Sequence, residues 1–223
     1  MAERLYLFDT TLRDGQQTSG VDFSLADKIR IANALDSLGL DYIEGGYPGA
    51  NPTDSQFFAE DRKLASAVMT AFGMTKRAGR SADNDPGFME VLNAQAGAVC
   101  LVAKSWDYHV DVALGISNDE NLASIRDSVA AVGKHGREAM IDCEHFFDGY
   151  KANRDYALAC ATAAFEAGAR WVVLCDTNGG TLPDEVFEIV SDVAQHIPGD
   201  HLGIHTHNDT ENAAANTLAA VQA

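Results

Sequence analysis

Residues 171–196 read WVVLCDTNGGTLPDEVFEIVSDVAQH, and this stretch shows the pattern that decides the fold. Residues 171–175 form a short, almost entirely apolar run, which is typical of a strand buried on both faces. A polar turn with two glycines follows at 176–180, and Pro183 then stands where the first turn of a helix tolerates a proline. The stretch therefore predicts one strand and one helix that covers it.

The same alternation of strand and helix extends in both directions along the chain. About seven such units follow one another at a spacing of roughly 30 residues, the usual size of a βα unit. Ser24 with Asp27 three residues later is typical of a helix start, and Gly39 is typical of a helix end. The predicted strands are residues 5–10, 42–45, 68–72, 98–103, 139–143, 171–175 and 202–207. The predicted helices include residues 24–38, 118–136, 153–167, 183–196 and 209–222.

Parallel strands joined by helices fit two architectures, a doubly wound open sheet and a (β/α)8 barrel. The first strand is not followed by a GxGxxG sequence, which removes the main support for a dinucleotide-binding sheet. Polar residues cluster just after the strands, and in a barrel these positions converge on the face that carries the active site. We therefore expect a TIM (β/α)8 barrel that forms one catalytic domain over residues 1–223. Because the sequence stops within the seventh helix, we expect the eighth strand to be absent or to come from another chain.

The composition limits the kind of partner that the protein can bind. The chain has 16 Lys and Arg against 33 Asp and Glu, a formal net charge of −17. Surfaces that bind nucleic acid or anionic lipid need clusters of basic residues, so both partners are unexpected. We expect no signal peptide, because the first residues lack a long apolar run, and no stretch of the sequence is apolar over the length of a membrane helix. We expect a cytoplasmic enzyme whose widely spaced cysteines are reduced core residues, namely Cys100, Cys143, Cys160 and Cys175.

Two histidines at the end of the last predicted strand suggest a metal site. Because side chains alternate along a strand, His205 and His207 point the same way. Asp14 follows the first strand, which in a closed barrel is separated from the seventh by one strand only. Two imidazoles and one carboxylate suit a divalent metal and leave positions open for substrate. The alternatives are incidental histidines in a polar loop and an aspartate that only shapes the turn before Gly15.

Four further residues at strand ends can carry chemistry. Arg13 beside a metal ligand suits a carboxylate or an enolate oxygen, and Glu44 can orient its guanidinium group. Glu144 is the leading general base, and Thr177 can donate a hydrogen bond to a substrate carboxylate. The alternative for Glu44 is an exposed cap residue, and the alternative for Thr177 is a simple turn.

With these residues in view, the chain resembles the DRE-type TIM-barrel metallolyases. That family includes the 2-isopropylmalate, homocitrate and citramalate synthases and 3-hydroxy-3-methylglutaryl-CoA lyase. The resemblance rests on DTTLRDG at residues 9–15, on Glu44 and on HTHND at residues 205–209. Within the family, the sequence most resembles the bacterial citramalate synthases. The resemblance lies in the stretches DYIEGGYPGANP (41–52), EHFFDGY (144–150) and LCDTNGGT (174–181).

The resemblance implies a Claisen-type condensation of acetyl-CoA with pyruvate, which gives citramalate and CoA for isoleucine synthesis. By family pattern, Asp14, His205 and His207 would hold a divalent ion (Mg, Mn or Zn). Arg13 would stabilise the enolate or keto oxygen, Glu144 would act as base, and Thr177 would bind the keto-acid carboxylate. Because a seven-stranded sheet would leave two unpaired edge strands, we also expect a homo-oligomer, such as a dimer. The family's Gly-Glu-Arg-x-Gly-Asn stretch and its C-terminal regulatory domain are absent from this sequence, so we expect weaker metal binding.

Other functions remain open at this stage. The related 2-isopropylmalate synthase, homocitrate synthase or lyase activities use the same site chemistry. A metal-dependent hydrolase barrel also uses an HxH pair, although typically after its first strand. A non-enzymatic alternative is an inactive fragment that needs a partner chain.

Overall fold

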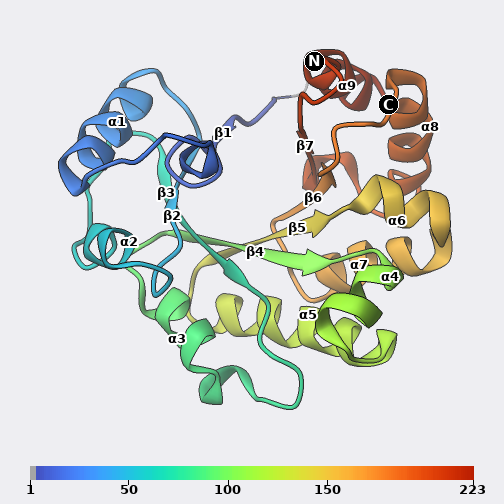
Figure 1. Cartoon of the computed structure of the whole chain (residues 1–223), viewed down its shortest axis with the longest axis horizontal. Helices are drawn as coiled ribbons and strands as arrows, with labels where there is room; N and C mark the ends of the chain where they lie inside the picture. The colour runs from blue at the N-terminus through green and yellow to red at the C-terminus, as the bar shows by residue number, and fades with distance from the viewer. Residues whose placement is uncertain (1–3) are drawn as a thin grey trace.

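The computed structural model describes residues 4–223 and contains one curved parallel sheet flanked by helices (Figure 1). Its seven strands are hydrogen-bonded in the order in which they occur along the chain. This order confirms the barrel-type sheet and excludes the doubly wound alternative, in which the strand order reverses. The strands are β1 (Phe8–Asp9), β2 (Tyr42–Gly46), β3 (Val68–Met74), β4 (Ala98–Lys104), β5 (Glu138–Glu144), β6 (Trp171–Asp176) and β7 (Leu202–Thr206).

The helices follow the strands as the sequence predicts. In Figure 1, α1 and α2 lie outside one end of the curved sheet, near β2 and β3, and α8 and α9 lie outside its other end, near β6 and β7. The predicted start of α1 is confirmed, because the Ser24 hydroxyl accepts from the Asp27 amide while the Asp27 carboxylate accepts from the Ser24 amide. The helices are α1 (Leu25–Ser37), α2 (Pro52–Phe57), α3 (Pro86–Asn93), α4 (Asp107–His109), α5 (Asn118–Lys134), α6 (Phe146–Ala152), α7 (Arg154–Glu166), α8 (Pro183–Val193) and α9 (Ala213–Gln222).

The predicted boundaries differ most from the structure at the first strand and at the last helix. The strand predicted over 5–10 is reduced to the two residues of β1, because the Leu7 carbonyl accepts from the amides of both Asp41 and Tyr42 instead of continuing a regular ladder. The helix predicted from residue 209 begins at Ala213, because the preceding residues form a polar turn. In that turn the Asn208 side chain accepts from the Ala213 amide.

The hydrophobic core has two parts, which follow from the alternation of side chains along the strands. A large cluster fills the space between the sheet and the helices, with Ile43, Leu101 and Ile141 among its members. A small cluster lies inside the curve of the sheet and contains Cys100 and Met140. All four cysteines are buried and unpaired, as predicted. Within residues 4–223 no helix is long and apolar enough to cross a membrane.

Candidate active site

Arg13 and Glu44 form an ion pair where β1 and β2 end. Arg13 Nε donates to Glu44 Oε2 at 2.7 Å, and its Nη1 donates to Asp14 Oδ1 at 3.1 Å. The guanidinium carbon also lies 4.0 Å from the centre of the Phe72 ring. These contacts fix the plane of the guanidinium group. Its Nη2 makes no hydrogen bond to any of residues 4–223, so this nitrogen is available to donate to a ligand.

Glu44 is fully buried, so it is not the exposed cap considered above. Burial raises the pKa of Glu44, and the charge of Arg13 opposes that rise. Burial lowers the pKa of Arg13, but the charge and hydrogen bond of Glu44 outweigh this effect and raise it. The second oxygen, Oε1, is buried without a hydrogen-bond partner in the described chain. A buried carboxylate with one unsatisfied oxygen is costly unless a bound group completes its environment.

Asp14, His205 and His207 meet across the gap between β1 and β7. Asp14 Oδ2 lies 3.6 Å from His205 Nε2 and 3.8 Å from His207 Nε2. One ligand atom from each residue lies within 4.8 Å of the other two, an arrangement that could hold a metal ion. The close contact with His205 lowers the pKa of Asp14, and the same contact raises the pKa of His205. The donor set of one carboxylate and two imidazoles fits a divalent ion such as Mg, Mn or Zn.

Glu144 pairs with a lysine that the sequence reasoning missed. Lys104 ends β4 directly opposite Glu144 at the end of β5, and the two side chains form an ion pair. Glu144 Oε1 accepts no hydrogen bond from residues 4–223. The signal for Lys104 is a cation that ends an apolar strand, which is the same kind of signal that singled out Glu44.

Thr177 follows β6, and its hydroxyl oxygen accepts a hydrogen bond of 2.8 Å from the amide of His145. The contact links the end of β6 to the residue after Glu144. Thr177 therefore lies at the same edge of the sheet as the other predicted residues. We call this set the strand-end site; it comprises Arg13, Asp14, Glu44, Glu144, Thr177, His205 and His207.

Asp142 is a second residue that the sequence reasoning missed. It lies two residues before Glu144 on β5 and shares its face of the sheet. Its side chain is buried, with ligand atoms of Cys175 and His205 within 4.8 Å. Burial raises its pKa. Strand alternation counted back from Glu144 could have identified it.

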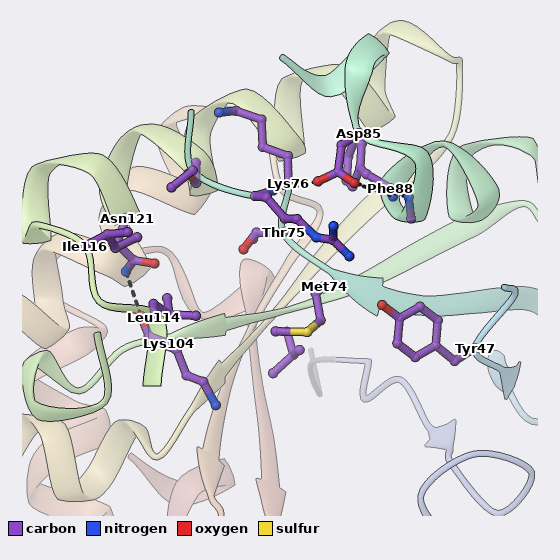
Figure 2. A pocket seen from close by; sticks show the side chains of 15 residues that line it. Tyr47, Met74, Thr75, Lys76, Asp85, Phe88, Lys104, Leu114, Ile116 and Asn121 are labelled. Atoms are coloured by element: carbon purple, nitrogen blue, oxygen red, sulfur yellow. Dashed lines mark hydrogen bonds between the residues drawn. The ribbon is translucent and has the colours of Figure 1, made fainter. Parts of the chain in front are cut away.

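A cavity of about 490 Å³ lies beside the strand-end site, beyond the ends of β3 and β4 (Figure 2). Figure 2 shows Tyr47, Met74 and Lys104 around its floor, with Asp85 and Asn121 on the surrounding elements. Arg77 and Lys104 contribute two cationic side chains to its lining, whereas the Lys76 ammonium pairs with Asp127 and donates to the Arg80 carbonyl. Because Lys104 also pairs with Glu144, this β3–β4 cavity adjoins the predicted base.

Named relatives match almost the whole length of the chain. Relatives named (R)-citramalate synthase share 47% to 50% identity with the chain. The one from Aquifex aeolicus is 50% identical over 225 residues, which cover 100% of this chain and 43% of the relative. The 2-isopropylmalate synthase of Pelotomaculum thermopropionicum is 33% identical and is covered over 43% of its length. The chain therefore spans less than half the length of these relatives.

The fold also matches solved structures. The hydroxymethylglutaryl-CoA lyase from Pseudomonas aeruginosa superposes with a TM-score of 0.80 at 23% identity, over 98% of this chain and 73% of the lyase. At that identity the match supports the barrel fold alone. The sequence model of the HMGL-like family matches residues 4–223. The chain therefore belongs to the HMGL-like family.

Proposed function

We propose that the strand-end site condenses acetyl-CoA with pyruvate and water to give citramalate and CoA. The observation that carries the proposal is the contact of Asp14, His205 and His207 beside the Arg13–Glu44 pair. This arrangement supplies a divalent-ion site and an oriented cation within one small volume. The identity to relatives named (R)-citramalate synthase supports pyruvate as the keto acid.

The keto acid would be bound by Arg13, by Thr177 and by a metal ion that the three ligand residues hold. A divalent ion held by Asp14, His205 and His207 would supply a Lewis acid that polarises the keto group. Thr177 would donate its hydroxyl proton to the carboxylate of pyruvate, since its oxygen already accepts from His145. Arg13 Nη2 would donate to the oxygen that gains charge, while Glu44 and Asp14 hold the guanidinium group in place.

Glu144 would remove a proton from the methyl group of acetyl-CoA. The resulting carbanion forms a carbon–carbon bond to the keto carbon of pyruvate, and the keto oxygen takes up a proton. Water then cleaves the thioester, which releases CoA. Lys104 would orient the Glu144 carboxylate through the ion pair and leave Oε1 free to accept the proton.

The β3–β4 cavity would take the phosphate-bearing part of acetyl-CoA. Arg77 and Lys104 bring two cationic side chains to its lining, in a chain with a net charge of −17. Cations suit phosphate groups, and Lys104 connects the cavity to Glu144. A thioester reaching from the cavity toward Glu144 would place its methyl group near the base.

Calorimetric titration of the chain with three keto acids in the presence of Mg²⁺ tests the proposal. We expect pyruvate to bind more tightly than 2-ketoisovalerate or 2-ketoglutarate, which are the keto acids of the related synthases. Mass spectrometry of a reaction with acetyl-CoA should then detect citramalate. Tighter binding of 2-ketoisovalerate would favour a 2-isopropylmalate synthase, and binding of none of the three would overturn the proposal.

A further inference from the structure

His145 adopts a backbone conformation that L-amino acids disfavour. Its φ is 54° and its ψ is 35°, in the left-handed region that suits glycine. Among residues 4–223, Glu211 is the one other non-glycine residue with a positive φ. His145 lies between Glu144, at the end of β5, and the first residue of α6. Strained residues of this kind persist where their surroundings hold them, often beside functional sites.

Close packing of α6 explains why the chain must turn so sharply. A Cβ atom at Gly149 would lie 2.6 Å from the carbonyl oxygen of Ser105, so α6 approaches the backbone after β4 as closely as glycine allows. The Ser105 hydroxyl donates to the Glu144 carbonyl at 2.7 Å and fixes the end of β5. With both sides fixed, the single residue between β5 and α6 must adopt the left-handed conformation.

The turn directs the amide of His145 at Thr177. The amide donates to the Thr177 hydroxyl oxygen at 2.8 Å. A hydroxyl that accepts from one side has its own proton available for an acceptor on another side. The backbone turn at His145 therefore restricts the directions in which Thr177 can donate.

The imidazole of His145 ties the turn to the residue after Thr177. Its Nδ1 lies 3.1 Å from Asp148 Oδ2, and the same oxygen accepts from the Asn178 side chain at 2.9 Å. On its other side the ring meets His109 edge to face, with 4.5 Å between ring centres. The side chain is 15% exposed, so these contacts are largely shielded from water. They hold the turn without a glycine.

We infer that His145 is a positioning residue that sets the Thr177 hydroxyl for a keto-acid carboxylate. The inference rests on the proposed function, because it takes Thr177 as the carboxylate donor. His145 acts in two ways: the backbone amide orients the hydroxyl, and the imidazole–Asp148 contact stabilises the left-handed turn.

Pyruvate affinity of single variants, measured by calorimetry with Mg²⁺, tests this division of roles. Thr177→Val should weaken binding about tenfold or more, because a hydrogen bond to a charged group is lost, and Thr177→Ser should retain most of it. His145→Ala should weaken binding severalfold, because alanine keeps the strain and loses the Asp148 contact. His145→Gly should bind nearly as well as the unchanged chain, because glycine adopts the turn freely.

A double variant distinguishes positioning from general destabilisation. If His145 acts through Thr177, His145→Ala should have no further effect on pyruvate affinity in the Thr177→Val background. Mn²⁺ affinity should stay unchanged in all of these variants, since neither residue touches the three ligand side chains. Glu211→Ala and Glu211→Gly are matched controls at the other left-handed position and should leave pyruvate affinity unchanged.

The outcomes separate this inference from the proposed function. Equal pyruvate affinity for His145→Ala and the unchanged chain would overturn the inference and leave the proposed function standing. Additive effects in the double variant would also overturn it. If the unchanged chain binds no pyruvate, the inference and the proposed function are both overturned. Should His145→Ala not fold, Asp148→Ala removes the same contact while leaving residue 145 unchanged. It should weaken pyruvate binding severalfold, and unchanged affinity would overturn the inference.

Discussion

At the scale of single residues, the three proposed metal ligands depend on one another. Removing one of three ligands should weaken divalent-ion binding at least about a hundredfold, more than the loss of an outer-shell contact. We expect this loss in His205→Ala, measured as Mn²⁺ affinity by electron paramagnetic resonance. His196→Ala removes an exposed histidine in the turn after α8 and should leave Mn²⁺ affinity unchanged. Unchanged affinity in His205→Ala would remove the metal site.

Glu144 makes a separate prediction at the same scale. Glu144→Gln keeps the shape of the side chain but cannot accept a proton, so exchange of the acetyl-CoA methyl protons with solvent should fall at least about a hundredfold. Proton NMR in deuterated water measures this exchange. Glu138→Gln makes the same change at the opposite end of β5, where the carboxylate accepts from the Tyr42 hydroxyl, and should leave exchange intact. Undiminished exchange in Glu144→Gln would assign the base to another residue.

At the scale of elements, the sequence predicted the strands better than their ends. Apolar runs identified all seven strands because burial on both faces leaves a continuous signal. The first residue of β1 depends on the hydrogen bonds from the Asp41 and Tyr42 amides to the Leu7 carbonyl, a pairing that residues 5–10 alone do not encode. Lys104 was missed for a related reason, because its importance comes from its register with Glu144 on the neighbouring strand.

One carboxylate at the end of α1 holds the segment that precedes β3, and this contact predicts a pH-dependent stability. The Asp36 carboxylate accepts from the amides of Ala65, Ser66 and Ala67, and these bonds lower its pKa to about 2. A carboxyl group with a lowered folded-state pKa stabilises the fold above its unfolded pKa of about 3.9, and that contribution is lost as the pH falls toward 2.

Asp36→Asn should therefore lower the urea midpoint at pH 6 and have a smaller effect near pH 2.5. Asp83→Asn is the control, since its exposed carboxylate accepts no hydrogen bond from residues 4–223. Equal effects of Asp36→Asn at the two pH values would show that the carboxylate charge does not hold this connection.

At the scale of the whole molecule, the curved sheet has two edges within residues 4–223. β1 is hydrogen-bonded to β2 and β7 to β6, and the outer side of each edge strand has no strand partner in the described chain. Apolar side chains are exposed nearby: Leu7 is 58% exposed, and Leu218 and Val221 on α9 are 64% and 50% exposed. Unpaired edges and apolar patches both favour association with another chain.

We therefore expect this chain to self-associate, with α9 in the contact. The double substitution Leu218→Glu and Val221→Lys introduces charges into that contact and should shift the chain toward monomer in analytical ultracentrifugation over a range of concentrations. Leu38→Glu is the control, because Leu38 is also exposed but directly follows α1, and α1 and α9 lie at opposite ends of the curved sheet (Figure 1). If α9 forms the contact, the control variant should associate like the unchanged chain. A monomer at every concentration would show that the exposed edges and α9 do not mediate self-association, and equal association of the double variant and the control would place the contact on another surface.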